Sequence, residues 1–163
     1  MDSLLEGLVE KIKQSGIEYD VEKITTAYEF AAAAHEGQMR RSGDPYVSHP
    51  VAVAIILIDL GLDTDSVIGG LLHDVVEDTP VELAMIEKQF GPDVSTLVDG
   101  VTKIGRIPYS SREEQQSENI RKMLLAMAKD IRVILIKLAD RLHNMRTARF
   151  WPPKKQLEKA FET

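Results

Sequence analysis

The sequence predicts an all-α fold: a single domain over residues 1–163, built as a bundle of about eight to ten helices. Apolar residues recur every three or four positions along most of the chain, which is the periodicity of amphipathic helices. Capping residues, glycines and prolines separate these segments at helical lengths. No Asn-Gly turn joins two alternating apolar runs, so the usual signal for a β-hairpin is missing from the sequence.

Two helices are predicted before residue 40. The apolar residues of 3–15 follow a helical spacing, and Gly16 directly after them is a typical helix stop. Asp20 can cap a second helix, whose apolar stripe continues toward Gly37. A polar loop rich in turn residues follows this second helix.

Two apolar helices are predicted next. Ser48 is expected to cap a helix through residues 51–60, which Gly61 closes. A fourth helix is expected from about Asp65 to Glu77. Residues 51–60 are apolar enough to form a strand, but their length and flanking caps favour a buried helix.

Prolines mark the helix starts in the second half. Thr79 and Pro80 are expected to open a short helix that ends at Phe90, and Pro92 opens another that runs to about Lys103. The segments predicted after these are a loop over 104–111, helices over 111–129 and 130–149, and a last segment from Pro152.

The composition excludes several classes of protein. The absence of cysteine rules out a disulfide framework, a cysteine-ligated zinc or iron–sulfur site and a thiol nucleophile. A net charge of −6 argues against non-specific nucleic-acid binding. The longest apolar runs are too short to span a membrane, and the N-terminus lacks a signal-peptide pattern. We therefore expect a cytoplasmic protein with neither a nucleic-acid nor a membrane partner.

The charge is unevenly distributed along the chain. Residues 1–100 carry a net charge of −13, and residues 101–163 carry +7. This asymmetry has two readings: two complementary surfaces of one fold, or a site that uses carboxylates for a cation and bases for a phosphorylated ligand.

Four ionisable side chains fall together at the end of the predicted fourth helix. His73 and Glu77 are separated by four residues, as are Asp74 and Asp78, so each pair shares a helical face. Acidic side chains at a helix C-terminus are disfavoured by the helix dipole, and a bound cation would compensate them. The alternative is an ordinary solvated helix end.

A polar stripe runs along the predicted helix 130–149. Lys137, Asp140, Asn144 and Thr147 follow a helical spacing within a segment whose first half is apolar on nearly all sides. Buried polar groups need partners, so this stripe predicts either an internal hydrogen-bond network or the wall of a site. Asp140 is a suitable oxygen ligand, and Asn144 and Thr147, one and two turns further on, can contact a bound organic ligand.

His49, together with three of the ionisable residues above, completes a set of two imidazoles and two carboxylates. His49, His73, Asp74 and Asp140 would supply two nitrogen and two oxygen ligands, which suit Mn²⁺, Fe²⁺ or Zn²⁺ better than Ca²⁺. A packing or capping role is the alternative for His49. The two remaining histidines, His35 and His143, are expected to pack or to support the site.

Basic and polar residues elsewhere offer contacts for phosphate. The loop after the second helix carries Arg40, Arg41 and Ser42, and Lys103 lies near the end of a later helix. Arginine forks and lysine point charges both bind phosphoryl groups well. Most of the basic residues of the chain are nevertheless expected to be solvated.

The order of His49, the His73-Asp74 pair and Asp140 resembles the HD superfamily of metal-dependent phosphohydrolases. The surrounding sequence is more specific. The segments HEGQMRRSGDPYVSHP, LLHDVVEDT, FGPDVSTLVDGVTKI and IKLADRLHNMRT resemble the hydrolase domain of RelA/SpoT homologues, over about residues 20–163.

This resemblance implies a function and a role for each matching residue. The implied reaction is hydrolysis of the alarmone (p)ppGpp at its 3′-pyrophosphate, which gives GDP or GTP and pyrophosphate, in control of the stringent response. The implied cofactor is one Mn²⁺ ion. The implied roles are metal ligation by His49, His73, Asp74 and Asp140, activation of water by Glu77 and Asp78, and guanine-nucleotide contacts by Arg40, Arg41, Ser42, Asn144, Thr147 and Lys103.

Two other functions stay open at this point. One is hydrolysis of a different nucleotide by the same site, and the other is a regulatory module that binds (p)ppGpp without turnover. No synthetase motif is present in the sequence. We therefore expect a hydrolase fragment of a longer bifunctional chain, with synthetase and regulatory domains outside these residues, or a small hydrolase on its own.

Overall fold

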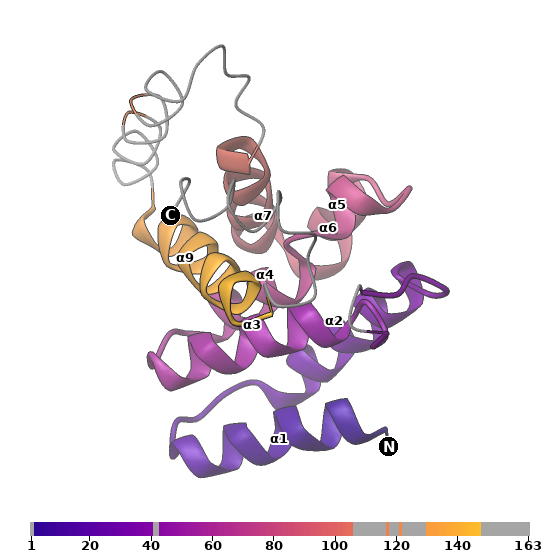
Figure 1. Ribbon diagram of the computed structural model, residues 1–163. Helices are drawn as coiled ribbons and strands as arrows, with labels where there is room; N and C mark the ends of the chain where they lie inside the picture. The colour runs from indigo at the N-terminus through magenta and orange to yellow at the C-terminus, as the bar shows by residue number, and fades with distance from the viewer. Residues whose placement is uncertain (1, 41–42, 106–116, 118–120, 122–129, 148–163) are drawn as a thin grey trace.

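The computed structural model describes residues 2–40, 43–105, 117, 121 and 130–147, and these residues form an all-α fold, as predicted (Figure 1). The only β-type pairing among them is an isolated bridge between Met39 and Pro45. The helices are α1 (Ser3–Ser15), α2 (Val21–Ala34), α3 (Ser48–Asp59), α4 (Thr64–Leu72), α5 (Val75–Asp78), α6 (Leu83–Phe90), α7 (Pro92–Gly105) and α9 (Ile131–Arg146).

The centre of the fold is the hairpin of α3 and α4. Gly61, with a φ of 76°, ends α3 in the left-handed region that glycine adopts without strain. The two helices then run back along each other, and their buried faces contribute much of the core. His49 and His73 lie about twelve residues before and after this turn. Antiparallel packing therefore brings the two imidazoles to the same end of the hairpin.

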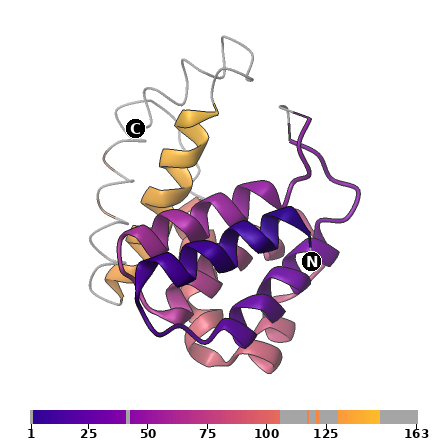
Figure 2. The same ribbon diagram turned by 90° about the horizontal axis from the view of Figure 1, so that it is seen from below.

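The other helices surround this hairpin. Helix α1 packs on α3, and α2 packs on α4 (Figure 2). On the other side, α7 and α9 both contact α4, and α9 also lies across α3 (Figure 1). The middle of α9 therefore meets the end of the hairpin that carries the two imidazoles.

A glycine lets α3 and α4 approach closely. A Cβ atom built at Gly70 would lie 2.7 Å from Leu57 Cδ1 and 3.4 Å from Val53 Cγ1. The carbonyl oxygen of Gly70 also lies 2.6 Å from Nδ1 of His73. The same residue thus permits the helix contact and fixes one ring nitrogen of a site histidine.

Four predicted boundaries are wrong. The second helix ends at Ala34 rather than at Gly37, with His35 as its C-cap. Ser48 is the first residue of α3 rather than its cap, and the preceding Val47 makes no side-chain capping bond.

The predicted helix 65–77 is interrupted at His73 and Asp74, and a separate turn, α5, follows. Helix α6 begins at Leu83, so Pro80 precedes the helix instead of opening it.

The other starts are confirmed. Asp20 caps α2 by accepting from the backbone N–H of Lys23 at 3.0 Å, and Pro92 is the first residue of α7. Asp130 accepts from the backbone N–H of Arg132 at the start of α9. The predicted helix 111–129, the end of helix 130–149 and the segment from Pro152 fall mainly or wholly outside the described residues.

Gly100→Ala is expected to destabilise the protein by about 1 kcal/mol or more, because overpacking a core costs about 1–3 kcal/mol. The new Cβ would lie 2.8 Å from Val133 Cγ2 on α9, and a β-branched side chain in a helix has little rotamer freedom with which to yield. Urea unfolding would measure the loss. The matched control is Gly7→Ala, whose Cβ meets nothing within 4 Å and which should stabilise α1 by about 0.5–1 kcal/mol. Equal stabilisation by both changes would contradict the prediction.

Among the residues that the structure describes, no helix combines the length and the apolar character that a bilayer crossing requires.

Candidate metal centre

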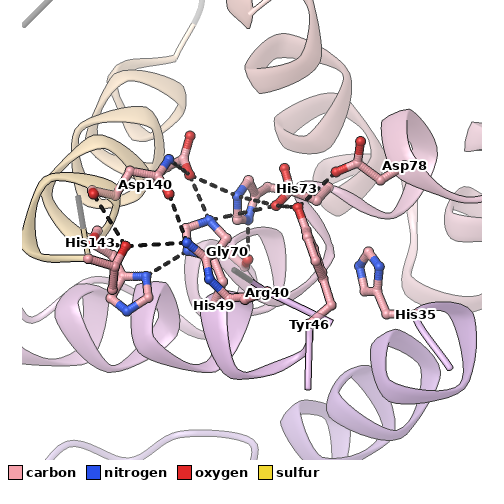
Figure 3. Close-up of polar contacts among 12 residues, drawn as sticks. His35, Arg40, Tyr46, His49, Gly70, His73, Asp78, Asp140 and His143 are labelled. Atoms are coloured by element: carbon pink, nitrogen blue, oxygen red, sulfur yellow. Dashed lines mark hydrogen bonds and ion pairs between the residues drawn. The ribbon is translucent and has the colours of Figure 1, made fainter. Parts of the chain in front are cut away.

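Three side chains from three helices converge at one end of the central hairpin (Figure 3). His49 comes from the first turn of α3, His73 from the end of α4 and Asp140 from the middle of α9, and all three are buried. Asp140 Oδ1 lies 2.7 Å from His49 Nε2 and 3.4 Å from His73 Nε2. These three ligand atoms lie within 4.8 Å of one another, so they form a possible metal site.

Asp74 adds a second carboxylate to this group. Its Oδ2 atom lies 3.2 Å from His73 Nε2 and 3.6 Å from His49 Nε2. The side chain is directed here because the helix breaks after His73, and Asp74 begins the turn that becomes α5. The structure thus brings together all four side chains that the sequence predicts as metal ligands.

Contacts among the two imidazoles and the two carboxylates of this site determine which of them are charged. Burial disfavours a charged imidazole at His73, but Asp74 and Asp140 outweigh burial and hold the pKa of His73 well above its ordinary value. Burial lowers the pKa of His49. Burial would raise the pKa of both carboxyl groups, but contacts with the imidazoles prevail, so the pKa of Asp74 falls to about 2 and that of Asp140 also lies well below its usual range. Both carboxylates are therefore ionised at neutral pH.

The residues present fit a divalent cation. Nε2 of His73 is buried, and although two carboxylates are near it, no well-directed hydrogen bond satisfies this atom. Two ligands held at about 2.1 Å from one cation lie roughly 3.0–3.5 Å apart when the angle between them is about 90–110°. The imidazole–carboxylate distances of 2.7–3.6 Å bracket this spacing. The donor set, two imidazoles and two ionised carboxylates, is one that transition-metal ions accept.

Two residues of α9 brace the Asp140 carboxylate. Lys137 Nζ donates to Oδ2 at 3.0 Å, which turns the other oxygen, Oδ1, toward the two imidazoles. Asn144 Nδ2 donates to Oδ1 at 3.2 Å. Because all three residues lie on one face of α9, the predicted polar stripe is a hydrogen-bond network and the wall of a site at once.

His143 supports the other nitrogen of His49. The two rings stack with centroids 4.9 Å apart, and their Nδ1 atoms lie 2.7 Å apart. Burial, with nearby His49 and Arg40, lowers the pKa of His143 to about 4, so its ring is neutral and one of its nitrogens can accept a hydrogen bond. With a cation held at Nε2 of His49, Nδ1–H of the same ring would donate to His143 and fix the tautomer that ligation needs.

His143→Phe is expected to weaken Mn²⁺ binding by about 10- to 100-fold, the usual effect of losing such an outer partner. Phenylalanine keeps a ring against His49 but removes the nitrogen that would accept the hydrogen bond from His49 Nδ1–H. Titration of the metal, followed by electron paramagnetic resonance, measures the affinity, and ¹⁵N chemical shifts report the His49 tautomer. Unchanged affinity and an unchanged tautomer would show that His143 only packs.

Tyr46 is a site residue that the sequence reasoning missed. Its hydroxyl lies 2.9 Å from Asp78 Oδ2 and 3.1 Å from Asp74 Oδ2, and its ring packs on His35 with centroids 4.6 Å apart (Figure 3). Burial and the two carboxylates raise the pKa of Tyr46 above its ordinary value, so the phenol keeps its proton. The only signal in the sequence is its place three residues before His49, which is too weak to predict the contact.

The predicted substrate residues fall into separate groups. Arg40 Nη2 donates to Asn144 Oδ1 at 3.2 Å and lies 3.4 Å from Thr147 Oγ1, so these three residues meet beside the metal centre. Lys103 is exposed on α7 and pairs with Asp99 at 2.8 Å, and no described contact joins it to this centre. Glu77 and Asp78 are exposed on α5, and Asp78 reaches the site through Tyr46. Arg41 and Ser42 lie outside the described residues.

The fold and the site together define a helical domain with a possible metal site. The family model described as HD domain matches residues 27–163, and the chain belongs to this family. The chain is 51% identical over 160 residues to a probable GTP pyrophosphokinase of Mycobacterium leprae. It is 48% identical over 160 residues to the bifunctional (p)ppGpp synthase/hydrolase SpoT of Escherichia coli K12. Each match covers 98% of this chain but only 20% and 23% of those relatives.

A solved structure supports the same assignment. It is described as a metazoan ortholog of SpoT that hydrolyzes ppGpp and plays a role in starvation responses. The two folds superpose with a TM-score of 0.69 at 29% identity, over 90% of this chain and 86% of that chain. The predicted resemblance to this family and the predicted helical fold are therefore confirmed.

Proposed function

We propose that this chain hydrolyses (p)ppGpp at its 3′-pyrophosphate to give GDP or GTP and pyrophosphate. The observation that carries the proposal is the buried convergence of His49, His73 and Asp140, with Asp74 beside them and Arg40 on one flank. The names of the relatives supply the substrate, since several are called guanosine-3′,5′-bis(diphosphate) 3′-pyrophosphohydrolases.

Mn²⁺ is the cofactor that we propose for His49, His73, Asp74 and Asp140. Mixed imidazole and carboxylate ligands suit Mn²⁺, whereas Ca²⁺ prefers ligands that are all oxygen. When bound, such an ion polarises a phosphoryl oxygen and lowers the pKa of a coordinated water.

The remaining chemistry falls to side chains of this protein. Asp78 and Glu77 lie on the turn directly after Asp74, where a carboxylate can accept the proton of the attacking water. Arg40 is held beside Asn144 and Thr147, and its guanidinium can bind phosphate oxygens and offset the charge that develops on them. Arg41, Ser42 and Lys103 stay proposed nucleotide contacts on the strength of the sequence alone.

Three further expectations stay predictions. These are the single domain over 1–163, the synthetase and regulatory domains outside this chain, and the cytoplasmic location.

The test of the function is release of pyrophosphate by the manganese-loaded protein. ³¹P nuclear magnetic resonance would follow pyrophosphate, and chromatography would identify GDP or GTP as the second product. A panel of other phosphorylated nucleotides separates the alarmone from other substrates of an HD domain. Turnover of a different nucleotide alone would contradict the proposal. Tight binding of ppGpp without pyrophosphate would instead support a regulatory module.

A further inference from the structure

A single tyrosine hydroxyl lies between two carboxylates of the site. Tyr46 Oη is 2.9 Å from Asp78 Oδ2 and 3.1 Å from Asp74 Oδ2 (Figure 3). A phenol carries one proton, and ionised carboxylates only accept hydrogen bonds. Tyr46 can therefore donate to only one of the two carboxylates at a time, and the surroundings decide which one.

The surroundings favour Asp78 as the acceptor. Asp74 already lies beside two imidazole nitrogens, and in the proposed function it also binds the cation, so its negative charge is compensated. Asp78 is more exposed, and its contact with Tyr46 is the shorter of the two. A hydrogen bond is stronger when its acceptor carries a charge that is not compensated by other groups. Asp78 is therefore the better acceptor for the Tyr46 hydroxyl.

The tyrosine ring is held in place independently of its hydroxyl. One neighbour is His35, and the guanidinium of Arg40 lies 5.9 Å from the ring centroid. The backbone N–H of Tyr46 donates to the carbonyl of Gln38 at 2.9 Å, which closes the loop before α3. The ring therefore has little freedom to move away from the acidic turn.

The same loop also holds the backbone of the acidic turn. Gln38 Nε2 donates to the carbonyl oxygen of Asp78 at 3.1 Å, and Gln38 Oε1 lies 3.2 Å from His35 Nδ1. Gln38 thus fixes the main chain of Asp78, while Tyr46 contacts its carboxylate. One loop therefore restrains both the main chain and the side chain of Asp78. These two restraints together keep its carboxylate in one orientation.

We propose that Tyr46 is a positioning residue for hydrolysis, which aims the Asp78 carboxylate at the attacking water through a hydrogen bond from its hydroxyl to that carboxylate. This inference rests on the proposed function and deepens it. It assigns Tyr46 a role in the rate of the chemical step, as opposed to substrate binding or metal binding.

Tyr46→Phe tests the role because it removes the hydroxyl and keeps the ring against His35 and Arg40. We expect kcat for ppGpp to fall by about 10- to 100-fold. The KM for ppGpp and the dissociation constant of Mn²⁺ should stay within about threefold of wild type, because a group that acts only on the chemical step leaves binding unchanged.

The matched control is Tyr28→Phe, which removes a hydroxyl that donates to Asp2 at 2.6 Å in a different part of the fold. Its kcat should equal that of wild type.

A double-mutant cycle with Asp78→Asn separates positioning from general stability. If Tyr46 acts through Asp78, the Tyr46→Phe change should lower kcat by less than about twofold once Asp78 is already Asn, because coupled residues are not additive. Full additivity would overturn the proposal. Weakened Mn²⁺ binding with a kcat that recovers at saturating metal would also overturn it, since the tyrosine would then act through Asp74.

A crystal structure of the Tyr46→Phe protein decides the positioning claim without reference to turnover. We expect the Asp78 carboxylate to leave its wild-type rotamer, and an unmoved carboxylate would overturn the inference. If the wild-type protein releases no pyrophosphate, the proposed function fails on that result alone. The position of Asp78 in the variant crystal then still decides whether Tyr46 holds it.

Discussion

Asp74→Asn is expected to reduce pyrophosphate release from ppGpp by at least about 10³-fold, because a metal supplies several kcal/mol of transition-state stabilisation. The Asp74 carboxylate lies 3.2 Å from His73 Nε2, where both can face one cation. Asparagine has nearly the same shape as aspartate, but its neutral amide is a poor ligand for that cation. The change removes one of the two negative charges that attract the cation. Mn²⁺ titration should show a much weaker site, while circular dichroism should show unchanged helix content.

The control for this variant is Asp65→Asn on the same helical hairpin. Asp65 pairs with Lys23 at 3.2 Å near the start of α4, far along the helix from His73, and its loss should leave turnover unchanged. Intact turnover by Asp74→Asn with metal still bound would reject the ligand assignment. His73→Ala should share the loss of turnover, but it also empties a buried position, so its free energy of unfolding should fall by about 2–4 kcal/mol.

The helices were predictable from the sequence because their limits are set locally. Asp20 and Asp130 cap the helices that follow them, and Gly16 and Gly61 end the helices before them, by interactions within a few residues. The grouping of His49 with His73 was predictable for a related reason. Two helices of similar length on either side of one turn place those positions at the same end of the hairpin.

The errors arise where tertiary contacts override local signals. The sequence gives no hint that the helix breaks after His73, because the Asp74 side chain then contacts Tyr46 and His49, which lie far away in sequence. Pro80 has the pattern of a helix start, yet the chain stays irregular until Leu83. The role of Tyr46 was invisible for the same reason, since its partners lie 28 and 32 residues away.

Asp78→Asn is expected to lower kcat by about 10²- to 10⁴-fold, the usual contribution of a general base, while Mn²⁺ affinity stays close to that of wild type. The amide keeps an oxygen that can accept the hydrogen bond from the Tyr46 hydroxyl, so the side chain can hold its place. It cannot take a proton from water. This result would separate the acidic turn from the metal ligands, since loss of a ligand lowers the affinity for metal and the rate together.

Comparison of Asp78→Asn with Glu77→Gln then assigns the proton acceptor. Both carboxylates lie on α5 and both are exposed, but Asp78 is the one joined to the site by Tyr46. The larger loss is therefore expected at Asp78. Asp59→Asn serves as the control, because this carboxylate pairs with Lys11 at 2.7 Å at the opposite end of α3 from His49. A larger loss at Glu77 would move the proton acceptor to that residue and leave Asp78 as its neighbour in the acidic turn.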